Sequence, residues 1–156
     1  MDQRINLRKA APEDLEFLFN LRNEESVRAV SFNSAPIDLD THRRWFEKKL
    51  ASSGSVIFIA EIGSLPIAQV RFDADGPRAE VGIAVVKSFR GKGHGTEILK
   101  QASSRFLKEF QKIKTVNAFI NLGNDISLRS FSKAGYRHIG KSDHGGLTRH
   151  LMILES

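Results

Sequence analysis

The sequence contains no cysteine among its 156 residues, which excludes a disulfide, a thiolate nucleophile and a cysteine-type zinc site. It also lacks an apolar run long enough to cross a bilayer, and its first ten residues, MDQRINLRKA, show no apolar stretch of the signal-peptide kind. We therefore expect a soluble, cytoplasmic protein with no membrane partner.

Internal repeats, low-complexity tracts and linkers are absent as well. A chain of this length suits one domain, here residues 1–156, and can bury a core without disulfides. The net charge of +6 favours anionic partners such as nucleotides, phosphorylated cofactors or nucleic acid, although a solvated basic surface would give the same balance. We expect no nucleic-acid partner, because no aromatic-basic platform or recognition motif accompanies the charge.

Helical and strand patterns alternate along the chain. Short turns around residues 63–66 and 74–77 predict an antiparallel meander of three strands. The helix over 38–52 is expected to start at Asp38 or Asp40 and to bury a stripe of Leu39, Trp45 or Phe46, and Leu50. The order predicts one α/β domain with a mostly antiparallel sheet. Strands are expected over 4–10, 55–63, 67–76, 78–86, 115–122, 136–140 and 147–154, helices over 11–22, 38–52, 96–110 and 124–135, and a helical turn or loop over 24–34.

A glycine-rich loop joins the strand over 78–86 to the following helix. Free N–H groups and the dipole at a helix start form an anion site, and glycines remove the Cβ atoms that would keep a phosphate away. Neighbouring lysine and arginine side chains add positive charge. The loop therefore predicts a ligand that carries a pyrophosphate. Its residues are Arg90, Gly91, Lys92, Gly93, His94, Gly95 and Thr96.

Two familiar phosphate-binding patterns are absent from this loop. The G-x-x-x-x-G-K-[ST] pattern fails because Gly95 is followed by Thr96 and Glu97, and the alternate spacing of the glycines does not fit G-x-G-x-x-G. The remaining pattern, RGKGHG, matches the R/Q-x-x-G-x-G/A signature of the GNAT superfamily of N-acetyltransferases. The segments AEVGIAV and NDISLRSFSKAGYRHIG resemble the fourth strand and a later helix of that family, so the resemblance covers nearly the whole chain.

This resemblance implies acetyl-CoA as the donor and no metal. It also implies a sheet whose fourth and fifth strands splay apart, flanked by about four helices, with the pantetheine arm of the cofactor between those strands. The N–H groups of the glycine loop would hold the pyrophosphate. Further cofactor contacts are expected from the backbone of Ile83 and Val85 and from Asn124, Ser127 and Phe131.

Direct transfer requires a base, because the ammonium form of an amine cannot attack the thioester. Glu80 is the first candidate, since members of the family often carry a glutamate at the start of the fourth strand; the alternative is a plain ion pair with a cation such as Arg71. Asp73 is the second candidate and His42 the third, because a histidine on a helix stripe is more often packed in the core.

The sequence departs from the family at the general acid. The position seven residues after Asn124, where many members have a tyrosine, is Phe131, and a phenyl ring donates no proton. The one tyrosine, Tyr136, falls where the family has a packed phenylalanine. Ser127, Ser130 or water remain as donors, or the thiolate leaves unassisted.

The N-terminal segment LRNEESVRAVSFNSAPIDLDTHRRWF resembles the RimJ/RimL-like branch, and within it amino-sugar N-acetyltransferases of the pseudaminic-acid pathway. That resemblance implies a 4-amino sugar on UDP as the acceptor. For the oligomeric state, the sequence leaves a monomer and a homodimer open. The alternatives are a protein N-terminus, as in ribosomal-protein acetyltransferases, and a non-catalytic acetyl-CoA sensor. Expected acceptor contacts are Arg22, Asn23, Arg28, Phe32, Asn33, Trp45 and Arg71.

Overall fold

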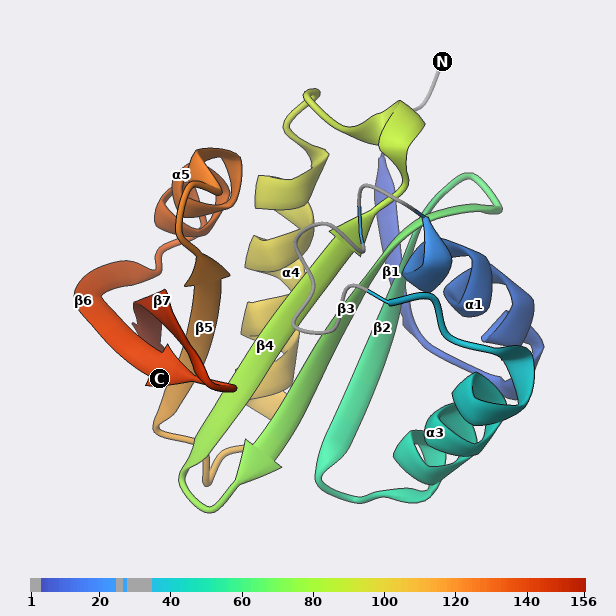
Figure 1. The fold of residues 1–156 in the computed structure, drawn as a ribbon, viewed down its shortest axis with the longest axis horizontal. Helices are drawn as coiled ribbons and strands as arrows, with labels where there is room; N and C mark the ends of the chain where they lie inside the picture. The colour runs from blue at the N-terminus through green and yellow to red at the C-terminus, as the bar shows by residue number, and fades with distance from the viewer. Residues whose placement is uncertain (1–3, 25–26, 28–34) are drawn as a thin grey trace.

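A computed structural model of the chain describes residues 4–24, 27 and 35–156 and shows a seven-stranded sheet flanked by helices (Figure 1). The strands follow the order β1-β2-β3-β4-β5-β7-β6, and β4 and β5 are the parallel pair in an otherwise antiparallel sheet. The strands are β1 (Ile5–Lys9), β2 (Ser55–Ile62), β3 (Leu65–Asp75), β4 (Arg78–Val85), β5 (Thr115–Asn121), β6 (Arg137–His144) and β7 (Leu147–Glu155).

Four α-helices flank the sheet in the described part of the chain. Asp38 begins α3 by accepting a hydrogen bond from the Thr41 backbone, and Asn124 begins α5 by accepting one from the Ser127 backbone, as predicted for both. A short 3-10 turn, Pro12–Asp14, leads into α1, and a second, Lys87–Phe89, follows β4. The helices are α1 (Leu15–Asn23), α3 (Leu39–Ala51), α4 (His94–Glu109) and α5 (Asp125–Lys133).

Each face of the sheet carries its own core. The larger core lies under α4, where Ile98, Leu99 and Phe106 are fully buried against β2 to β5, β7 and α5. The smaller core lies under α1 and α3, where Phe46 and Leu18 pack on β2. We call this second side the α3 face. Because side chains alternate along a strand, every second residue of β3, β4 and β5 points to the α3 face.

The parallel strands β4 and β5 pair over only three positions. Arg78, Ala79 and Glu80 lie beside residues 115–117, after which β4 continues to Val85 and β5 to Asn121 without pairing to each other. Figure 1 shows the two strands diverging from this joint. The predicted splay of the fourth and fifth strands is therefore confirmed, together with the fold class.

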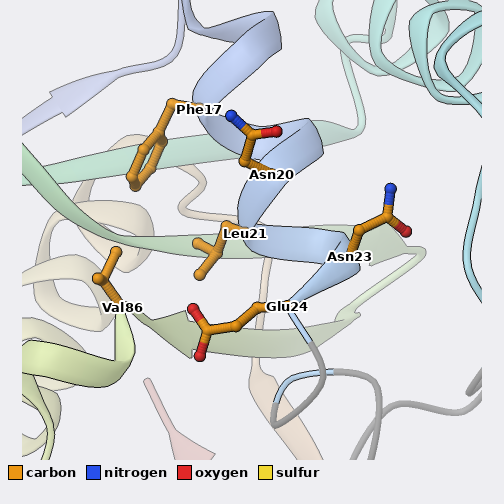
Figure 2. A pocket seen from close by; sticks show the side chains of 6 residues that line it. All are labelled: Phe17, Asn20, Leu21, Asn23, Glu24 and Val86. Atoms are coloured by element: carbon orange, nitrogen blue, oxygen red, sulfur yellow. The ribbon is translucent and has the colours of Figure 1, made fainter.

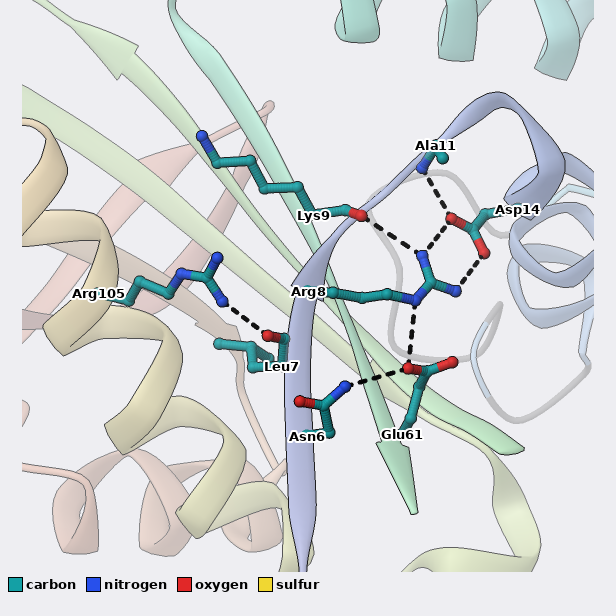
Figure 3. Close-up of polar contacts among 8 residues, drawn as sticks. All are labelled: Asn6, Leu7, Arg8, Lys9, Ala11, Asp14, Glu61 and Arg105. Carbon is teal, nitrogen blue, oxygen red and sulfur yellow. Dashed lines mark hydrogen bonds and ion pairs between the residues drawn. The ribbon is translucent and has the colours of Figure 1, made fainter. Parts of the chain in front are cut away.

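An ion-pair network fastens β1 to the start of α1 (Figure 3). The Arg8 guanidinium donates two hydrogen bonds of 2.8 Å to the Asp14 carboxylate and lies 3.2 Å from Glu61 on β2. Asp14 also accepts from the Ala11 backbone at 2.8 Å. These contacts, led by the bond from Arg8, lower the pKa of the buried Asp14 carboxyl although burial opposes them. The network holds α1 against the sheet.

The structure differs from three expectations: the buried stripe of α3, the start of β3 and the end of β6. In α3 the predicted stripe is wrong at both ends, because Leu39 and Leu50 are 41% and 38% exposed while His42 and Phe46 in the middle are buried. Strand β3 begins at Leu65, inside the expected turn, and β6 runs past the expected end to His144. The segment expected as a helical turn over 24–34 lies almost wholly outside the described residues.

Candidate active site

The glycine loop ends in the N-terminus of α4. Gly93 is the N-cap, with a φ of 82°, and the Glu97 N–H donates the first bond of the helix to the Gly93 carbonyl. The N–H groups of His94, Gly95 and Thr96 therefore have no acceptor within the helix, which is the arrangement that binds an anion. Gly91 also has positive φ, 73°, and a Cβ at either Gly91 or Gly93 would meet no atom within 4 Å. The loop is an open cradle that fits a pyrophosphate.

The cations of the loop have different neighbours. Arg90 donates from Nε to the Val85 carbonyl at 2.9 Å and from a terminal nitrogen to Glu24 at 3.0 Å, so it ties the loop to β4 and to the end of α1. Lys92 lies over the Phe89 ring, 5.5 Å from its centroid. The His94 ring tilts against the same phenyl group. Of Arg90 and Lys92, only Arg90 has an ion-pair partner among the described residues.

The residues expected along the cofactor arm occupy the walls of the splay. Ile83 and Val85 lie on the part of β4 beyond the joint, with side chains against the α4 core. Ser127 lies in the first turn of α5, next to its cap Asn124. Ser130 faces α4, with its hydroxyl 3.9 Å from where a Cβ of Gly95 would be. The α4 N-terminus and α5 therefore border the same opening.

The ring at the family's tyrosine position is buried. Phe131 is 4% exposed and packs edge-on against Tyr136, with ring centroids 5.0 Å apart. The Tyr136 hydroxyl lies 2.8 Å from Ser103 on α4 inside the core, and burial raises its pKa well above the ordinary value. Neither ring presents a proton donor to the splay.

Glu80 lies at the joint of β4 and β5, on the α3 face. A pocket of about 300 Å³ opens there, and the Glu80 carboxylate forms part of its wall. Nε2 of His144, at the end of β6, lies 2.5 Å from Oε1 of Glu80. The His144 ring stacks on Phe119 of β5, with centroids 3.8 Å apart. The pocket is lined by Asp73, Ala74, Asp75, Arg78, Ala79, Glu80, Asn117, Phe119 and His144.

Asp73 lies directly across from Glu80 on β3, but its carboxylate is already engaged. It accepts hydrogen bonds from Lys49 and Ser55 at 2.7 Å and from Arg71 at 2.9 Å. Burial alone would raise the pKa of Asp73, but the bonds from Lys49 and Ser55 and the charge of Arg71 together hold it below the ordinary value. Asp73 is therefore a weak base that orders the cations around it.

Arg71, one of the expected acceptor contacts, pairs with Gly82 of β4, two residues beyond Glu80. Its guanidinium stacks over Trp45 of α3 at 5.3 Å and is fixed through Nε by Asp73. Its Nη2 lies 3.9 Å from where a Cβ of Gly82 would be, so the group reaches across β3 to β4. Within the described residues its two Nη nitrogens donate no hydrogen bond. A planar, stacked guanidinium of this kind is suited to bind an anion.

Two further predicted residues, His42 and Asn23, make contacts with other parts of the protein. His42 is 2% exposed, its ring lies among Phe19, Trp45 and Phe46, and burial lowers its pKa, with the charge of Arg22 adding to the effect. The Asn23 amide bonds both backbone groups of Ile37. Arg28, Phe32 and Asn33 lie outside the described residues.

A second pocket, of about 340 Å³, lies between the end of α1 and the end of β4. Figure 2 shows the apolar side chains of Leu21 and Val86 next to the Glu24 carboxylate. Glu24 is also the partner of Arg90, so this pocket adjoins the glycine loop. Its lining is Phe17, Asn20, Leu21, Asn23, Glu24 and Val86.

The family follows from residues 4–137, which match the acetyltransferase (GNAT) domain. That range covers most of the chain, so the protein belongs to the GNAT acetyltransferase family and is an N-acetyltransferase that uses acetyl-CoA. Among the helices of the described residues, none is both long and apolar enough to span a membrane. In the same residues no three histidine, aspartate or glutamate side chains gather as a metal site.

Known proteins resemble the chain over most of its length. A Bacillus subtilis (strain 168) protein, YwnH, named provisionally as a phosphinothricin acetyltransferase, is 28% identical over 143 residues, which is 87% of this chain and 86% of the relative. The structure of the aminoglycoside acetyltransferase AAC(6')-Ib with paromomycin and acetyl-CoA aligns with a TM-score of 0.84 at 19% identity, covering 97% and 93% of the two chains. A spermidine N-acetyltransferase from Vibrio cholerae aligns with a TM-score of 0.84 at 17% identity, covering 97% and 95%.

Sequence reasoning did not include several residues that line the Glu80 pocket or bond its Asp73. Lys49 and Ser55, which engage Asp73, are distant in sequence and carry no motif. Asn117, Phe119 and His144 reach the pocket only because β5 pairs with both β4 and β7. The alternation of buried and exposed residues along β5 was the one available signal for Asn117 and Phe119.

Proposed function

We propose that the protein transfers the acetyl group of acetyl-CoA to the amine of a 4-amino sugar carried on UDP. The observation that carries this proposal is the Arg71 guanidinium, which is stacked on Trp45, fixed by Asp73 and placed over Gly82, on the same face of the sheet as Glu80. A guanidinium can bind a diphosphate bidentately, and an aromatic ring beside it can stack on a sugar or base.

Glu80 is the proposed base. Its carboxylate takes the proton from the acceptor nitrogen as that nitrogen attacks the thioester carbonyl. The C–S bond breaks, the acetyl group stays on the nitrogen and the electron pair leaves with sulfur as the CoA thiolate. Asp73 is a poorer candidate because three donors already engage it, and His42 because its ring is enclosed by aromatic side chains.

The position of the joint supports this assignment. The proposed phosphate cradle at Gly93 lies at the open end of the splay, and Glu80 lies where the splay closes. A cofactor arm that runs from the phosphate cradle at Gly93 to the closed end of the splay would bring its thioester to the Glu80 pocket. The thiolate then departs with help from Ser127, Ser130 or water, because Phe131 and Tyr136 are buried.

The structural neighbours support an amine as the acceptor, but the kind of amine differs from one neighbour to the next. Those named above were solved with aminoglycosides, which are amino sugars, and with spermine. A ribosomal-protein-alanine N-acetyltransferase from Brucella melitensis aligns at 20% identity with a TM-score of 0.80. A peptide N-terminus is the second candidate; its ammonium group would have to share the Glu24 carboxylate in the pocket beside α1 with Arg90, which already pairs with it.

The acceptor is tested by acetylation of a panel followed by mass spectrometry. The panel contains a UDP-linked 4-amino sugar, kanamycin, spermidine and a peptide with N-terminal alanine. We expect the UDP sugar to react best and free UDP to compete with it. Arg71→Ala should lower kcat/KM for the UDP sugar about ten- to a hundredfold by removing a charged hydrogen bond, whereas Arg44→Ala, which removes an exposed arginine of α3, should not.

Two outcomes would overturn the proposed acceptor. Efficient peptide acetylation that millimolar UDP leaves unchanged would favour the N-terminal acetyltransferase. Acetyl-CoA binding without transfer to any panel amine would instead favour a sensor that binds acetyl-CoA but does not turn it over.

A further inference from the structure

We propose that His144 is a positioning residue for the base: its Nε2–H holds one oxygen of the Glu80 carboxylate so that the other oxygen faces the acceptor amine. The inference rests on the proposed role of Glu80. It concerns a residue from the far end of the chain, on the β6–β7 hairpin, which carries no residue of the predicted site.

The His144 ring is fixed in place from several sides. Its ring lies on Phe119 with only 12° between the planes, and Gly145 and Gly146, both with positive φ, turn the chain back at once into β7. The backbone carbonyl of His144 accepts a hydrogen bond from the buried Arg149, which also donates to Asn121 of β5 at 2.9 Å. The hairpin end is thereby joined to β5.

The contact with Glu80 sets the direction of the carboxylate. Nε2 and Oε1 lie 2.5 Å apart, which is an ion-pair distance, and Oε1 has no partner in hydrogen-bond geometry among the described residues. Two lone pairs at that distance would repel, so the contact requires a proton on Nε2, and a small rotation of the ring would bring that N–H into line with Oε1. A neutral ring protonated on Nε2 and an imidazolium both supply this proton. With Oε1 held, Oε2 is left to accept the amine proton in a defined orientation, which is a large part of what a catalytic base contributes.

Among the residues that the structure describes, three other charged side chains line the pocket of this contact. On β3, Asp73 is occupied by Lys49, Ser55 and Arg71, so it does not compete for His144. The other charged side chains that line the pocket are Asp75 at the end of β3 and Arg78 at the start of β4. Their opposite charges lie at positions that pair across the two strands.

Three variants of His144 separate positioning from packing. His144→Phe keeps a ring on Phe119 but has no donor, and His144→Asn has an amide too short to reach. His144→Gln carries an N–H at about the place of Nε2. With the panel amine that reacts best, we expect the Phe and Asn variants to lower kcat at least tenfold with KM for acetyl-CoA unchanged. The Gln variant should stay within about threefold of the wild type.

A double-mutant cycle with Glu80→Gln tests whether His144 acts through Glu80. If it does, His144→Phe should have little further effect in the Glu80→Gln background. Equal losses in both backgrounds, or a Gln variant as impaired as the Phe variant, would overturn the proposal. Thermal unfolding of each variant identifies any that fail to fold.

One measurement needs no acceptor. Nitrogen-15 NMR of the wild type reports which ring nitrogen carries the proton, and His144→Phe assigns the signal. We expect a protonated Nε2 in His144, a signal that changes in Glu80→Gln, and no change for His138 and His150, which contact each other. An unprotonated Nε2 would refute the contact itself. A protein that acetylates no amine but shows the expected spectrum would contradict the proposed function and leave the contact intact.

Discussion

Two carboxylates that face each other across β3 and β4 have different neighbours and therefore different chemistry. Asp73 accepts three hydrogen bonds from cations and a serine, which stabilise its charge and reduce its basicity. Glu80 contacts one imidazole and borders an open pocket. The assignment of Glu80 as the base follows from this contrast rather than from its position in the sequence alone.

The Arg8–Asp14 pair gives a prediction about stability and pH. The pKa of Asp14 is lower in the folded chain than the value of about 3.9 expected when unfolded, so the pair stabilises the fold above that value and the effect is lost as the pH falls through the folded pKa. Asp14→Asn should cost about 1–3 kcal/mol at pH 7, toward the lower end because Arg8 is 36% exposed.

Urea unfolding at pH 7 and at pH 3 measures this effect. The difference in free energy of unfolding between wild type and Asp14→Asn should shrink at pH 3. Glu47→Gln, which changes an exposed carboxylate in the middle of α3, should have little effect at either pH. An equal cost of Asp14→Asn at both pH values would contradict the assigned ion pair.

Residue roles were predictable where they depend on neighbours in sequence. The caps Asp38 and Asn124 act on groups three residues away, and both were expected. Lys49 and Ser55 act on Asp73 across 24 and 18 residues, and no local pattern indicates such contacts. The same reason explains why His144 was not predicted.

At the scale of elements, periodicity and turn residues predicted most helices and strands, because both signals are local. The order along the chain was predicted, and the turns at Gly63 and Gly76 have the positive φ that glycine allows. The burial of a helix end was not predictable, since Leu39 and Leu50 continue the apolar stripe of α3 but are 41% and 38% exposed. Whether a helix end is covered depends on elements that are distant in sequence.

The glycine loop and the start of α4 give a prediction about acetyl-CoA binding. Gly91 and Gly93 share positive φ and open surroundings, so an alanine at either should cost a similar backbone strain of about 1–2 kcal/mol. Gly93, as the N-cap, adjoins the free N–H groups of α4, whereas Gly91 lies two residues earlier. We expect Gly93→Ala to weaken acetyl-CoA binding at least tenfold and Gly91→Ala to weaken it much less.

Titration calorimetry with acetyl-CoA measures both affinities, and thermal unfolding checks that the two variants lose similar stability. Gly95→Ala is a further control, because a Cβ there meets only the Ser130 hydroxyl, at an ordinary 3.9 Å, in a helical backbone. Equal affinities for Gly91→Ala and Gly93→Ala would place the phosphates elsewhere.

At the scale of the whole molecule, the site depends on the strand order. The chain forms β1 to β4 as a meander, crosses through α4 to lay β5 parallel to β4, and returns so that β7 pairs with β5. The splay was expected from family resemblance, but the position of the β6–β7 hairpin was not. That position brings His144 to Glu80, 64 residues earlier in the chain.

The central claim is that this fold places a base, Glu80, where the splayed strands join and the acetyl group is transferred. The most direct measurement is CoA release at neutral pH with the best panel amine, for wild type, Glu80→Gln and Asp75→Asn, the last changing a carboxylate of the same pocket. The account predicts that Glu80→Gln lowers kcat about a hundredfold or more with acetyl-CoA affinity nearly unchanged, while Asp75→Asn stays near wild type. A kcat near that of the wild type in Glu80→Gln would contradict it.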